Sequence, residues 1–141
     1  MDSLEVRKSN VYGKGCFTLQ PIRKRQKFAS YEGELIRGYR KIEARVRKQE
    51  AAGDIKIIRI GDEWAIDGAV GGNATAYINH SCAPNAFMRT AGHDKVLFFA
   101  LRDIEAGEEI TMDYRDPYHP AAGQCRCGAP NCRSLKNGRK S

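Results

Sequence analysis

Residues 77–85, "YINHSCAPN", place four polar and reactive side chains next to one another: the amide of Asn79, the imidazole of His80, the hydroxyl of Ser81 and the thiol of Cys82. Pro84 follows and restricts the backbone just beyond them. An amide and an imidazole can hold a polar ligand by hydrogen bonds, whereas a thiolate is a metal ligand. The stretch therefore predicts a functional site and leaves open whether its side chains serve one site or two.

Cysteine usage favours a metal centre. The chain has five cysteines, and three of them crowd into the segment "CRCGAPNC" as Cys125, Cys127 and Cys132. In a reducing compartment, such crowding and an odd count indicate metal binding rather than disulfides. Zinc prefers four tetrahedral thiolate or imidazole ligands, so one position remains for a water molecule or a distant residue.

The fourth ligand has several candidates. Cys82 is favoured because it lies in a turn between a polar run and Ala-Pro, where a core thiol is poorly placed. His119 and Cys16 are alternatives, although Cys16 alternates with Phe17 at a strand start and is better explained as a core residue. A site joining Cys82 to the tail would also order a segment, from about residue 115 onward, that is too poor in aliphatic side chains to build a core by itself.

Length and composition bound the rest of the molecule. The 141 residues suit one domain with one modest core, and 41% hydrophobic residues with a mean hydropathy of −0.58 suit a globular protein in water. No apolar run approaches the roughly 18 residues that a membrane helix needs, and the first residues lack a signal-peptide pattern. We therefore expect an intracellular protein without a membrane partner.

The net charge is +7, and the basic residues are not evenly spread. One cluster lies within residues 37–48 and a second near the C-terminus; the members are Arg37, Arg40, Lys41, Arg45, Arg47 and Lys48 in the first and Arg133, Lys136, Arg139 and Lys140 in the second. Such clusters can attract nucleic acid or an acidic partner. A solvated surface is the simpler explanation for either cluster taken alone.

The elements that must position these residues are mostly short strands. Strand-like segments rich in Val, Ile, Phe and Tyr occupy residues 4–8, 16–19, 27–36, 55–60, 63–67, 84–89, 94–101 and 108–114. The segment "KVLFFALR" is the most apolar of them and predicts a buried strand. The fold class is therefore mainly β.

One surface helix is predicted over residues 39–51. Tyr39, Ile42 and Val46 fall on one face, and Lys and Arg cover the rest. Glu43 and Arg47 are spaced to pair on the surface, and Gly53 is a plausible stop. A second, short helix is expected over "NATAYIN", where Asn73 can serve as its cap.

Five short motifs carry a family resemblance: "YGKGCF" (12–17), "SYEGELI" (30–36), "YINHSCAPN" (77–85), "GEEITMDY" (107–114) and "CRCGAPNCR" (125–133). In this order they resemble the G-x-G loop, the Y-x-G-E segment, the N-H-S-C-x-P-N motif, the G-E-E-L-T-x-D-Y segment and the post-SET cysteine motif of the SET-domain protein lysine methyltransferases. One motif alone would be weak, the glycine loop especially. Five in the family's order, over nearly the whole chain, are very specific.

The resemblance implies a fold of several small curved β-sheets around a pseudoknot, in which the D-Y segment passes through a loop near the N-H-S motif. One surface helix and a zinc-bound post-SET tail complete it. Residues 1–116 would form the SET domain and residues 117–141 the tail. The chain begins almost at the first strand, so we expect a minimal unit without a cysteine-rich segment before it. The surface that such a segment would cover makes a homodimer an option.

The resemblance also assigns residues to a reaction, methyl transfer from S-adenosylmethionine to a lysine of a histone or another chromatin-type protein. Tyr114 would be the catalytic tyrosine, Tyr31 would help to form the lysine channel, and Met112 occupies the position that tunes how many methyl groups are added. The cofactor-binding residues would be Gly13, Lys14, Gly15, Asn79, His80 and Arg126. The zinc ligands would be Cys82, Cys125, Cys127 and Cys132.

The chemistry of such a transfer requires a neutral lysine amine, and the ordinary pKa of lysine is about 10.4. A narrow apolar channel and the nearby sulfonium cation both disfavour the ammonium form, so no strong general base is needed. Aromatic walls suit the lysine stem, and alignment along the line of attack supplies much of the remaining rate.

Two positions depart from the family pattern. Ala76 and Tyr77 replace a common Arg-Phe pair, which removes an expected basic contact to the carboxylate of the cofactor unless another basic residue substitutes. Met112 replaces a Phe or Tyr and has no hydroxyl to restrict a partly methylated amine, so we expect di- or trimethylation to be reachable.

A binding module without catalysis is the alternative function. A zinc-stapled basic domain could dock on chromatin or nucleic acid through the helix at 39–51. The joint presence of Tyr114, Asn79 and His80 argues against it, because a non-catalytic domain of the family would be expected to lose some of them. A chain of this kind is expected in the nucleus on chromatin if it is eukaryotic, and otherwise in the cytoplasm or as an exported effector.

Overall fold

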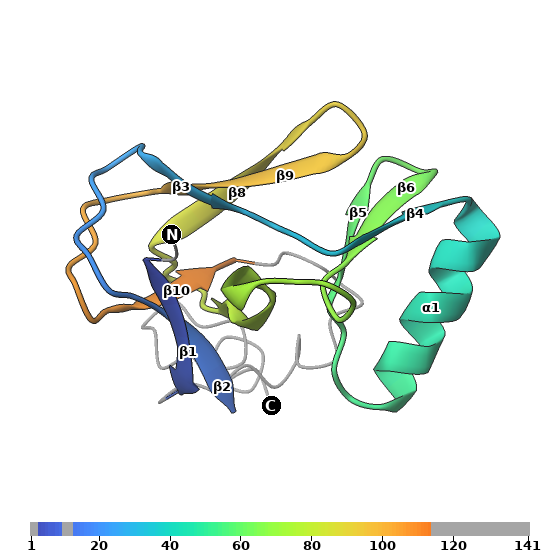
Figure 1. Ribbon diagram of the computed structural model, residues 1–141, viewed down its shortest axis with the longest axis horizontal. Coiled ribbons are helices and arrows are strands. Elements are labelled where there is room, and N and C mark those ends of the chain that lie inside the picture. Colours follow the sequence, from blue (N-terminus) through green and yellow to red (C-terminus); the bar gives the residue numbers. More distant parts are fainter. Residues whose placement is uncertain (1–2, 10–12, 114–141) are drawn as a thin grey trace, which may run out of the picture.

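The computed structural model describes residues 3–9 and 13–113 of the chain (Figure 1). This part forms short strands, one longer helix and one 3-10 helix, η1. In chain order the elements are β1 (Leu4–Lys8), β2 (Lys14–Thr18), β3 (Lys27–Ser30), β4 (Glu34–Arg37), α1 (Tyr39–Ala51), β5 (Ile57–Ile60), β6 (Trp64–Asp67), η1 (Ala74–Tyr77), β7 (Asn79–His80), β8 (Ala86–Ala91), β9 (Lys95–Ala100) and β10 (Glu109–Met112).

The strands of this part of the chain form two sheets. Seven strands make one sheet in the order β1-β2-β10-β8-β9-β3, with β7 paired to β10, and three strands make the other in the order β4-β6-β5. Most pairings are antiparallel, and β10 is the strand that also has parallel neighbours, β7 and β8. The predicted class, mainly β with one surface helix, is confirmed. The pseudoknot crossing and the boundary between residues 116 and 117 fall outside the described residues.

The core is built from strands with one buried face. In β9, Val96, Phe98 and Ala100 are buried, whereas Leu97 and Phe99 are half-buried. This alternation follows from the two-residue period of a strand. The prediction of a buried strand at "KVLFFALR" is therefore right for one of its faces. Full burial of a side chain such as Phe98 contributes roughly 1.5–3 kcal/mol.

Helix α1 packs against β4 and β6, and its bounds agree with the prediction (Figure 1). Ile42 is buried against Ile36 and Ala65, and Val46 packs at the edge of this contact. Tyr39 was expected on the same buried face, but its side chain is 60% exposed. The helix meets the sheet one turn further on, through Ile42, so its first residue projects into solvent.

The predicted surface pair between Glu43 and Arg47 is wrong. Glu43 instead forms an ion pair with Arg59, at 2.5 Å. Arg59 belongs to β5, so the pair joins α1 to the neighbouring sheet rather than to the next helical turn. The helix ends as expected, because Gly53 has a φ of +78°, which glycine adopts at little cost.

A buried carboxylate of β6 attaches helix α1 to the three-stranded sheet. Asp67, at the end of β6, is 1% exposed and accepts hydrogen bonds from Arg45 Nη1 at 2.8 Å, Gln49 Nε2 at 2.9 Å and the Ala69 N–H at 2.9 Å. Burial alone would raise the pKa of Asp67, but these hydrogen bonds from Gln49, Ala69 and Arg45 outweigh it and lower the pKa below its ordinary value. Two side chains of α1 thereby hold a charged anchor in the sheet.

The short helix η1 forms where it was predicted. Asn73 caps it, and its side-chain oxygen accepts a hydrogen bond from the Thr75 N–H at 3.1 Å. The Asn73 amide also donates to the carbonyl of Ser30 at 3.1 Å, which ties η1 to β3. Over residues 3–9 and 13–113, no helix is long and apolar enough to cross a membrane.

Candidate functional site

Strand β10 brings the predicted motifs together. It pairs antiparallel with β2, which carries the glycine segment, and in parallel with β7, which consists of Asn79 and His80 (Figure 1). Met112 lies opposite His80, and the Ser81 N–H donates to the Met112 carbonyl at 3.0 Å. Three motifs that are far apart in sequence therefore meet on one strand.

The amide of Asn79 is held in one orientation. Its Nδ2 donates to the carbonyl oxygen of Lys14 at 3.0 Å and to Oε2 of Glu109 at 2.9 Å. Ser9 Oγ also donates to this carboxylate, at 2.8 Å. Since a carbonyl and a carboxylate can only accept, they fix which end of the Asn79 amide is nitrogen and turn Oδ1 away from them. The Asn79 side chain is thus fixed between the Lys14 carbonyl and the Glu109 carboxylate.

The two glycines of the G-x-G segment are required for different reasons. Gly13 has a φ of +48° in the turn after β1, and its carbonyl accepts a hydrogen bond from the Ser9 N–H at 2.7 Å. At Gly15, a Cβ would lie 2.3 Å from Oε2 of Glu109. The sequence predicts that the backbone at Gly15 approaches the cofactor closely. In the structure this backbone also lies close to a group of the protein itself, the Glu109 carboxylate that orients Asn79.

His80 and Cys82 are neighbours in space as well as in sequence. Both side chains are buried, and His80 Nε2 lies 3.3 Å from Cys82 Sγ. The other ring nitrogen of His80 lies 3.7 Å from Oδ1 of Asp113. The ring therefore lies between a thiol and a carboxylate, where it can orient Cys82.

Cys82 is buried but does not belong to the apolar core cluster. A sulfur that contacts a ring nitrogen suits a metal-bound thiolate, whose charge such a donor supports. Within residues 3–9 and 13–113, no group of three or more His, Cys, Asp or Glu side chains could hold a metal ion. Several predicted site residues lie outside the described residues: the zinc ligands Cys125, Cys127 and Cys132, the tail residue Arg126, and Tyr114.

Cys16 is a core residue, as predicted. It is fully buried on β2, and burial raises the pKa of its thiol to about 12, with a further contribution from the negative charge of Glu109. The side chain of Cys16 lies within the main apolar cluster of the described residues, which argues against this residue as the fourth zinc ligand.

Tyr31 is buried, and its hydroxyl donates to the carbonyl of Lys56 at 2.6 Å. Its ring packs edge-on against Phe98, with 6.1 Å between the ring centroids. Gly68 leaves room for it, since a Cβ there would lie 2.5 Å from the hydroxyl oxygen. With its hydroxyl bound to the backbone, Tyr31 is suited to form the wall of a channel.

Lys56 links Tyr31 to helix α1. The Lys56 N–H donates to Oε1 of Gln49 at 2.7 Å, and Gln49 also holds Asp67. The Lys56 ammonium lies 4.6 Å from the centre of the Tyr77 ring. Tyr77, one of the two residues that depart from the family pattern, therefore carries a cation on its face.

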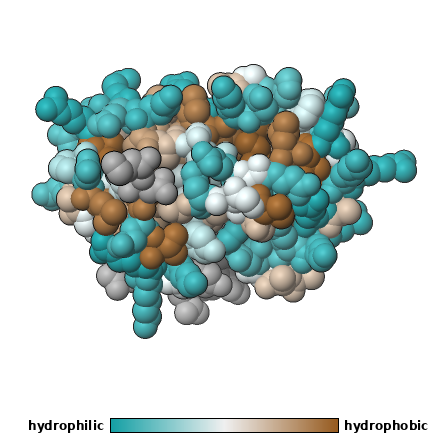
Figure 2. Space-filling model, viewed as in Figure 1, coloured by the Kyte–Doolittle hydropathy of each residue, from teal (hydrophilic) through white to brown (hydrophobic). Residues whose placement is uncertain are grey.

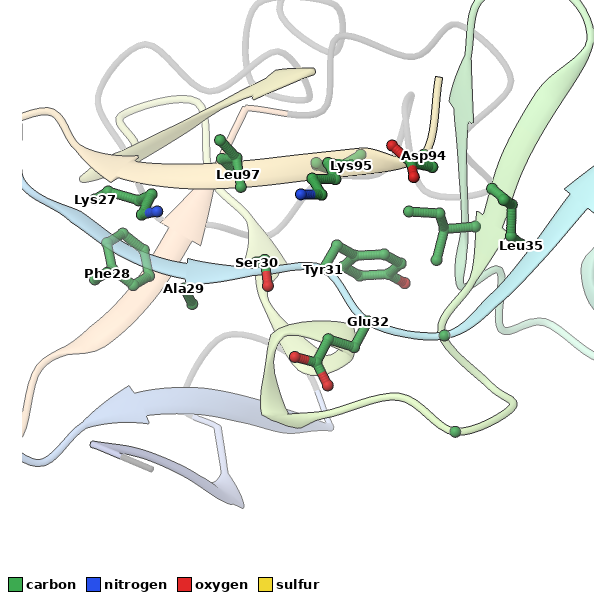
Figure 3. Close-up of a pocket in the computed structure, with 14 residues that line it drawn as sticks. Lys27, Phe28, Ala29, Ser30, Tyr31, Glu32, Leu35, Asp94, Lys95 and Leu97 are labelled. Carbon is green, nitrogen blue, oxygen red and sulfur yellow. The ribbon is translucent and has the colours of Figure 1, made fainter. Parts of the chain in front are cut away.

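An open cavity of about 710 Å³ lies between β3, β9 and the three-stranded sheet (Figure 3). It is lined by Lys27, Phe28, Ala29, Ser30, Tyr31, Glu32, Gly33, Leu35, Ile66, Gly71, Asp94, Lys95, Val96 and Leu97. Figure 3 shows the Tyr31 ring pointing toward Leu35, with Asp94 and Lys95 on one side and Glu32 on the other. Of the predicted site residues that the structure describes, Tyr31 lines this cavity. The predicted cofactor-binding residues among them do not line it.

A stack of side chains lies beside this cavity. The rings of Trp64 and His93 are 4.2 Å apart at 28°, and the Arg37 guanidinium lies 5.1 Å from the Trp64 ring. His93 belongs to the turn between β8 and β9 and directly precedes Asp94, which lines the cavity. The stack therefore ties this hairpin to the three-stranded sheet.

Sequence reasoning missed Glu109 and Ser9. Glu109 stands in the segment "GEEITMDY", in which the family resemblance assigns roles to Met112 and Tyr114. Its position opposite β2 follows only from the pairing of β10, so no local pattern connects it to Gly15 or Asn79.

Comparison with known proteins adds independent findings. The SET domain family model matches residues 13–115. The chain is 34% identical over 140 residues to the histone-lysine N-methyltransferase trithorax of Drosophila virilis, and 37% identical over 134 residues to a histone-lysine N-methyltransferase, H3 lysine-4 specific, of Schizosaccharomyces pombe. It is 34% identical over 146 residues to histone-lysine N-methyltransferase 2B of Homo sapiens.

These alignments cover most of this chain but little of the relatives. They include 96%, 92% and 96% of the chain, respectively, and 4%, 14% and 5% of the three relatives. The similarity therefore concerns one domain of much longer proteins.

Proposed function

Because this chain belongs to the SET domain family, we propose that it is a protein lysine N-methyltransferase that uses S-adenosylmethionine. The observation that carries the proposal is the convergence on β10. There the glycine segment of β2, the Asn79–His80 strand and Met112 lie together, as a single cofactor and substrate site requires.

The residues around Asn79 fit the amino acid end of the cofactor. The oxygen of the oriented Asn79 amide would accept a hydrogen bond from the ammonium group of the cofactor, and the Glu109 carboxylate adds negative charge beside it. An ammonium group carries only donors, so this set of acceptors suits it. Gly13, Lys14, Gly15 and His80 would contribute mainly backbone atoms, and Arg126 would lie near the adenine. When bound, S-adenosylmethionine supplies a methyl group on a sulfonium centre.

The substrate lysine would enter a channel walled by Tyr31 and Met112. Both side chains are buried, so the channel disfavours a charged ammonium and favours the neutral amine that attacks. Tyr114 would hold this amine in line with the methyl group through its hydroxyl. Positioning of this kind replaces a strong general base.

The metal in this proposal is a structural zinc ion held by Cys82, Cys125, Cys127 and Cys132. Cys82 fits, because its sulfur is buried beside a ring nitrogen of His80. With its four ligands from one turn and the tail, the ion would hold the tail over the cofactor site. Its role would be structural, since four protein ligands leave no open position for chemistry.

We propose a histone as the substrate and the nucleus, on chromatin, as the location of the reaction. The relatives at 34% and 37% identity are named histone-lysine N-methyltransferases, and one of them is named H3 lysine-4 specific. A histone H3 tail peptide that includes the lysine specified in this name is therefore the first substrate to try. The homodimer remains a prediction, which light scattering of the purified chain can check.

A methyl-transfer assay on the full chain with zinc present tests the proposal. We expect label from S-adenosylmethionine to appear on an H3 peptide or on members of a lysine peptide array. Tyr114→Phe should lower the rate by roughly a hundredfold, the size of effect seen when one transition-state hydrogen bond is removed. Tyr39→Phe is the matched control, since this exposed tyrosine should not affect the rate.

Unchanged activity of Tyr114→Phe would overturn the catalytic assignment. A thermal shift measurement separates the proposal from a non-catalytic binding module. If S-adenosylmethionine gives no stabilisation while zinc is retained, the binding module is favoured.

A further inference from the structure

Helix α1 carries a stripe of four exposed cations that form no ion pair within the described residues. Of the six basic residues clustered in sequence, Arg45 is bound to Asp67 and Glu34, and Arg37 stacks on Trp64. The other four are exposed and take part in none of the ion pairs of the described residues. These four, the α1 stripe, are Arg40, Lys41, Arg47 and Lys48.

Helix geometry places these four side chains together. Residues seven apart are only about 20° apart around a helix, so Arg40 lies in line with Arg47 and Lys41 with Lys48. The two columns face away from Ile42, which is buried against the sheet. The acidic residues of α1, Glu43 and Glu50, form a column next to that of Arg40 and Arg47, and Glu43 is paired with Arg59. No acidic residue lies between the two basic columns. In Figure 2 the part of the surface over α1 is largely hydrophilic.

The stripe is unfavourable for the helix that carries it. Arg40 and Lys41 lie in the first turn, where the helix dipole favours acidic residues, and this turn contains none. Gly38 provides no side-chain cap for the same end. Residues that break a local rule without a structural gain are expected at functional surfaces.

We infer that the α1 stripe binds the phosphate backbone of nucleic acid. Phosphates are bound chiefly by clustered Lys and Arg. Between the two columns lie the small side chains of Ala44 and Ala51, whereas a protein partner would be expected to bury larger apolar side chains at the centre of its interface. The stripe runs from Arg40 to Lys48, about 12 Å along the helix axis, so its cations can contact more than one phosphate of the same backbone. Nothing in this inference depends on methyl transfer.

A second group of four cations provides a matched control. Arg23, Lys24 and Arg25 lie in the turn before β3, and Lys27 is the first residue of β3; all four, together named the basic turn, are exposed. It lies at the opposite end of the molecule from α1 (Figure 1). Neutralising this basic turn changes the net charge by the same amount as neutralising the α1 stripe.

The experiment measures binding of a fluorescein-labelled DNA duplex of mixed sequence to the full zinc-loaded chain by anisotropy, over a series of salt concentrations. Alanine at the four stripe positions should weaken binding at least tenfold at low salt. It should also reduce the slope of log K against log salt by about two to four, nearly one for each phosphate that the variant no longer neutralises. Alanine is the best helix former, so this variant should fold.

In the control variant, Arg23, Lys24 and Lys27 are replaced by alanine. Arg25 is replaced by glycine, because its φ of +71° suits glycine better than alanine. This variant should bind the duplex nearly as well as the unmodified chain. The double variant Arg40→Glu, Lys41→Glu separates binding from folding. Its acidic first turn should leave the melting temperature equal or higher, while duplex binding falls as in the quadruple variant.

Equal losses for the stripe and turn variants would show that only net charge matters, and they would overturn the inference. Full affinity in the stripe variant would overturn it as well. Poly-glutamate that binds the stripe more tightly than the duplex at equal charge would assign the surface to an acidic protein instead of nucleic acid. Because no methyl donor is present, none of these results depends on the proposed catalytic function.

Discussion

Glu109 shows how one side chain can serve several parts of a site. Its carboxylate accepts hydrogen bonds from Ser9 and Asn79, lies against Gly15 and raises the pKa of Cys16. It does not itself need to touch a ligand. Its effect passes through Asn79, whose amide nitrogen it holds.

Removing this carboxylate should weaken the binding of S-adenosylmethionine. Glu109→Ala leaves one of the two acceptors that orient Asn79, and the lost hydrogen bond corresponds to roughly a tenfold higher Kd. Glu109→Gln should retain most of the affinity, because its amide oxygen can accept from Asn79 while its nitrogen donates to Ser9. Calorimetric titration measures both variants.

The control for this prediction is methylthioadenosine, a fragment that lacks the amino acid end of the cofactor. It should bind Glu109→Ala and the unmodified chain equally well. An equal loss of affinity for the fragment would mean that Glu109 supports the fold of the whole site rather than the orientation of Asn79.

The side chain of Met112 bears on how many methyl groups are transferred. It is buried opposite His80 and has no hydroxyl to hold a partly methylated amine in one pose. We expect di- or trimethylated product in a saturated reaction, and Met112→Tyr should shift the product toward the monomethyl form. Intact-mass analysis of the peptide distinguishes these, and monomethyl product alone from the unmodified chain would contradict the prediction.

At the scale of elements, the attachment of α1 decides the shape of the region beside Tyr31. Asp67 binds Arg45 and Gln49 of the helix, and Gln49 binds the backbone of Lys56, whose carbonyl receives the Tyr31 hydroxyl. A continuous set of hydrogen bonds thus joins the helix to the channel wall. The position of α1 and the position of Tyr31 are coupled.

Breaking the anchor should destabilise the domain. Asp67→Asn keeps the shape of the side chain but leaves Arg45 without its buried partner, which costs about 1–3 kcal/mol of the free energy of unfolding. Urea unfolding followed by circular dichroism measures this. Glu34→Gln removes the exposed partner of the same Arg45 and should cost less than about 0.5 kcal/mol, as is usual for surface pairs.

The anchor should also depend on pH, with a definite sign. The pKa of Asp67 is lowered in the folded chain, so its contribution is complete above the ordinary carboxyl pKa of about 4 and is lost as the pH falls through the folded value. The stability difference between the unmodified chain and Asp67→Asn should therefore shrink on acidification. A difference that stayed constant, or grew, would show that Asp67 acts without its charge.

For the whole molecule, the central expectation is that metal and cofactor binding are coupled. The turn that carries Cys82 directly follows the strand that carries Asn79, and β10 holds both through the Met112 carbonyl and the pairing with β7. A zinc ion that draws the tail to Cys82 would also bring it over the cofactor residues. Metal loss should therefore affect ligand binding in the same step.

Chelation tests this coupling. Treatment with a strong zinc chelator should raise the Kd for S-adenosylmethionine by tenfold or more, and restored zinc should reverse the change. Thiol titration provides the parallel readout: four of the five cysteines should react after chelation, while Cys16, with a pKa of about 12, reacts only on unfolding. Unchanged cofactor affinity in metal-free protein would show that the two halves of the motif act independently.

The sequence by itself determined much of this protein because several of its features are local. The helix at 39–51, its stop at Gly53 and the cap at Asn73 depend on residues close together in the chain, and they are found where predicted. The fold class follows in the same way, from short β-favouring segments punctuated by glycine. The candidate site could be identified because its motifs are contiguous and occur in a specific order.

Only the tertiary structure decided which distant groups meet. The Glu109–Asn79 contact, the partner of Glu43 and the exposure of Tyr39 depend on how strands pair and where a helix meets a sheet, and these are set by many weak long-range contacts. The same holds for the basic cluster at 37–48, which the sequence presents as one group. Arg37 belongs to β4 and lies over the Trp64 ring. Helix α1 directs Arg45 to Asp67 and leaves four cations exposed, because a helix separates side chains by angle rather than by order in the chain.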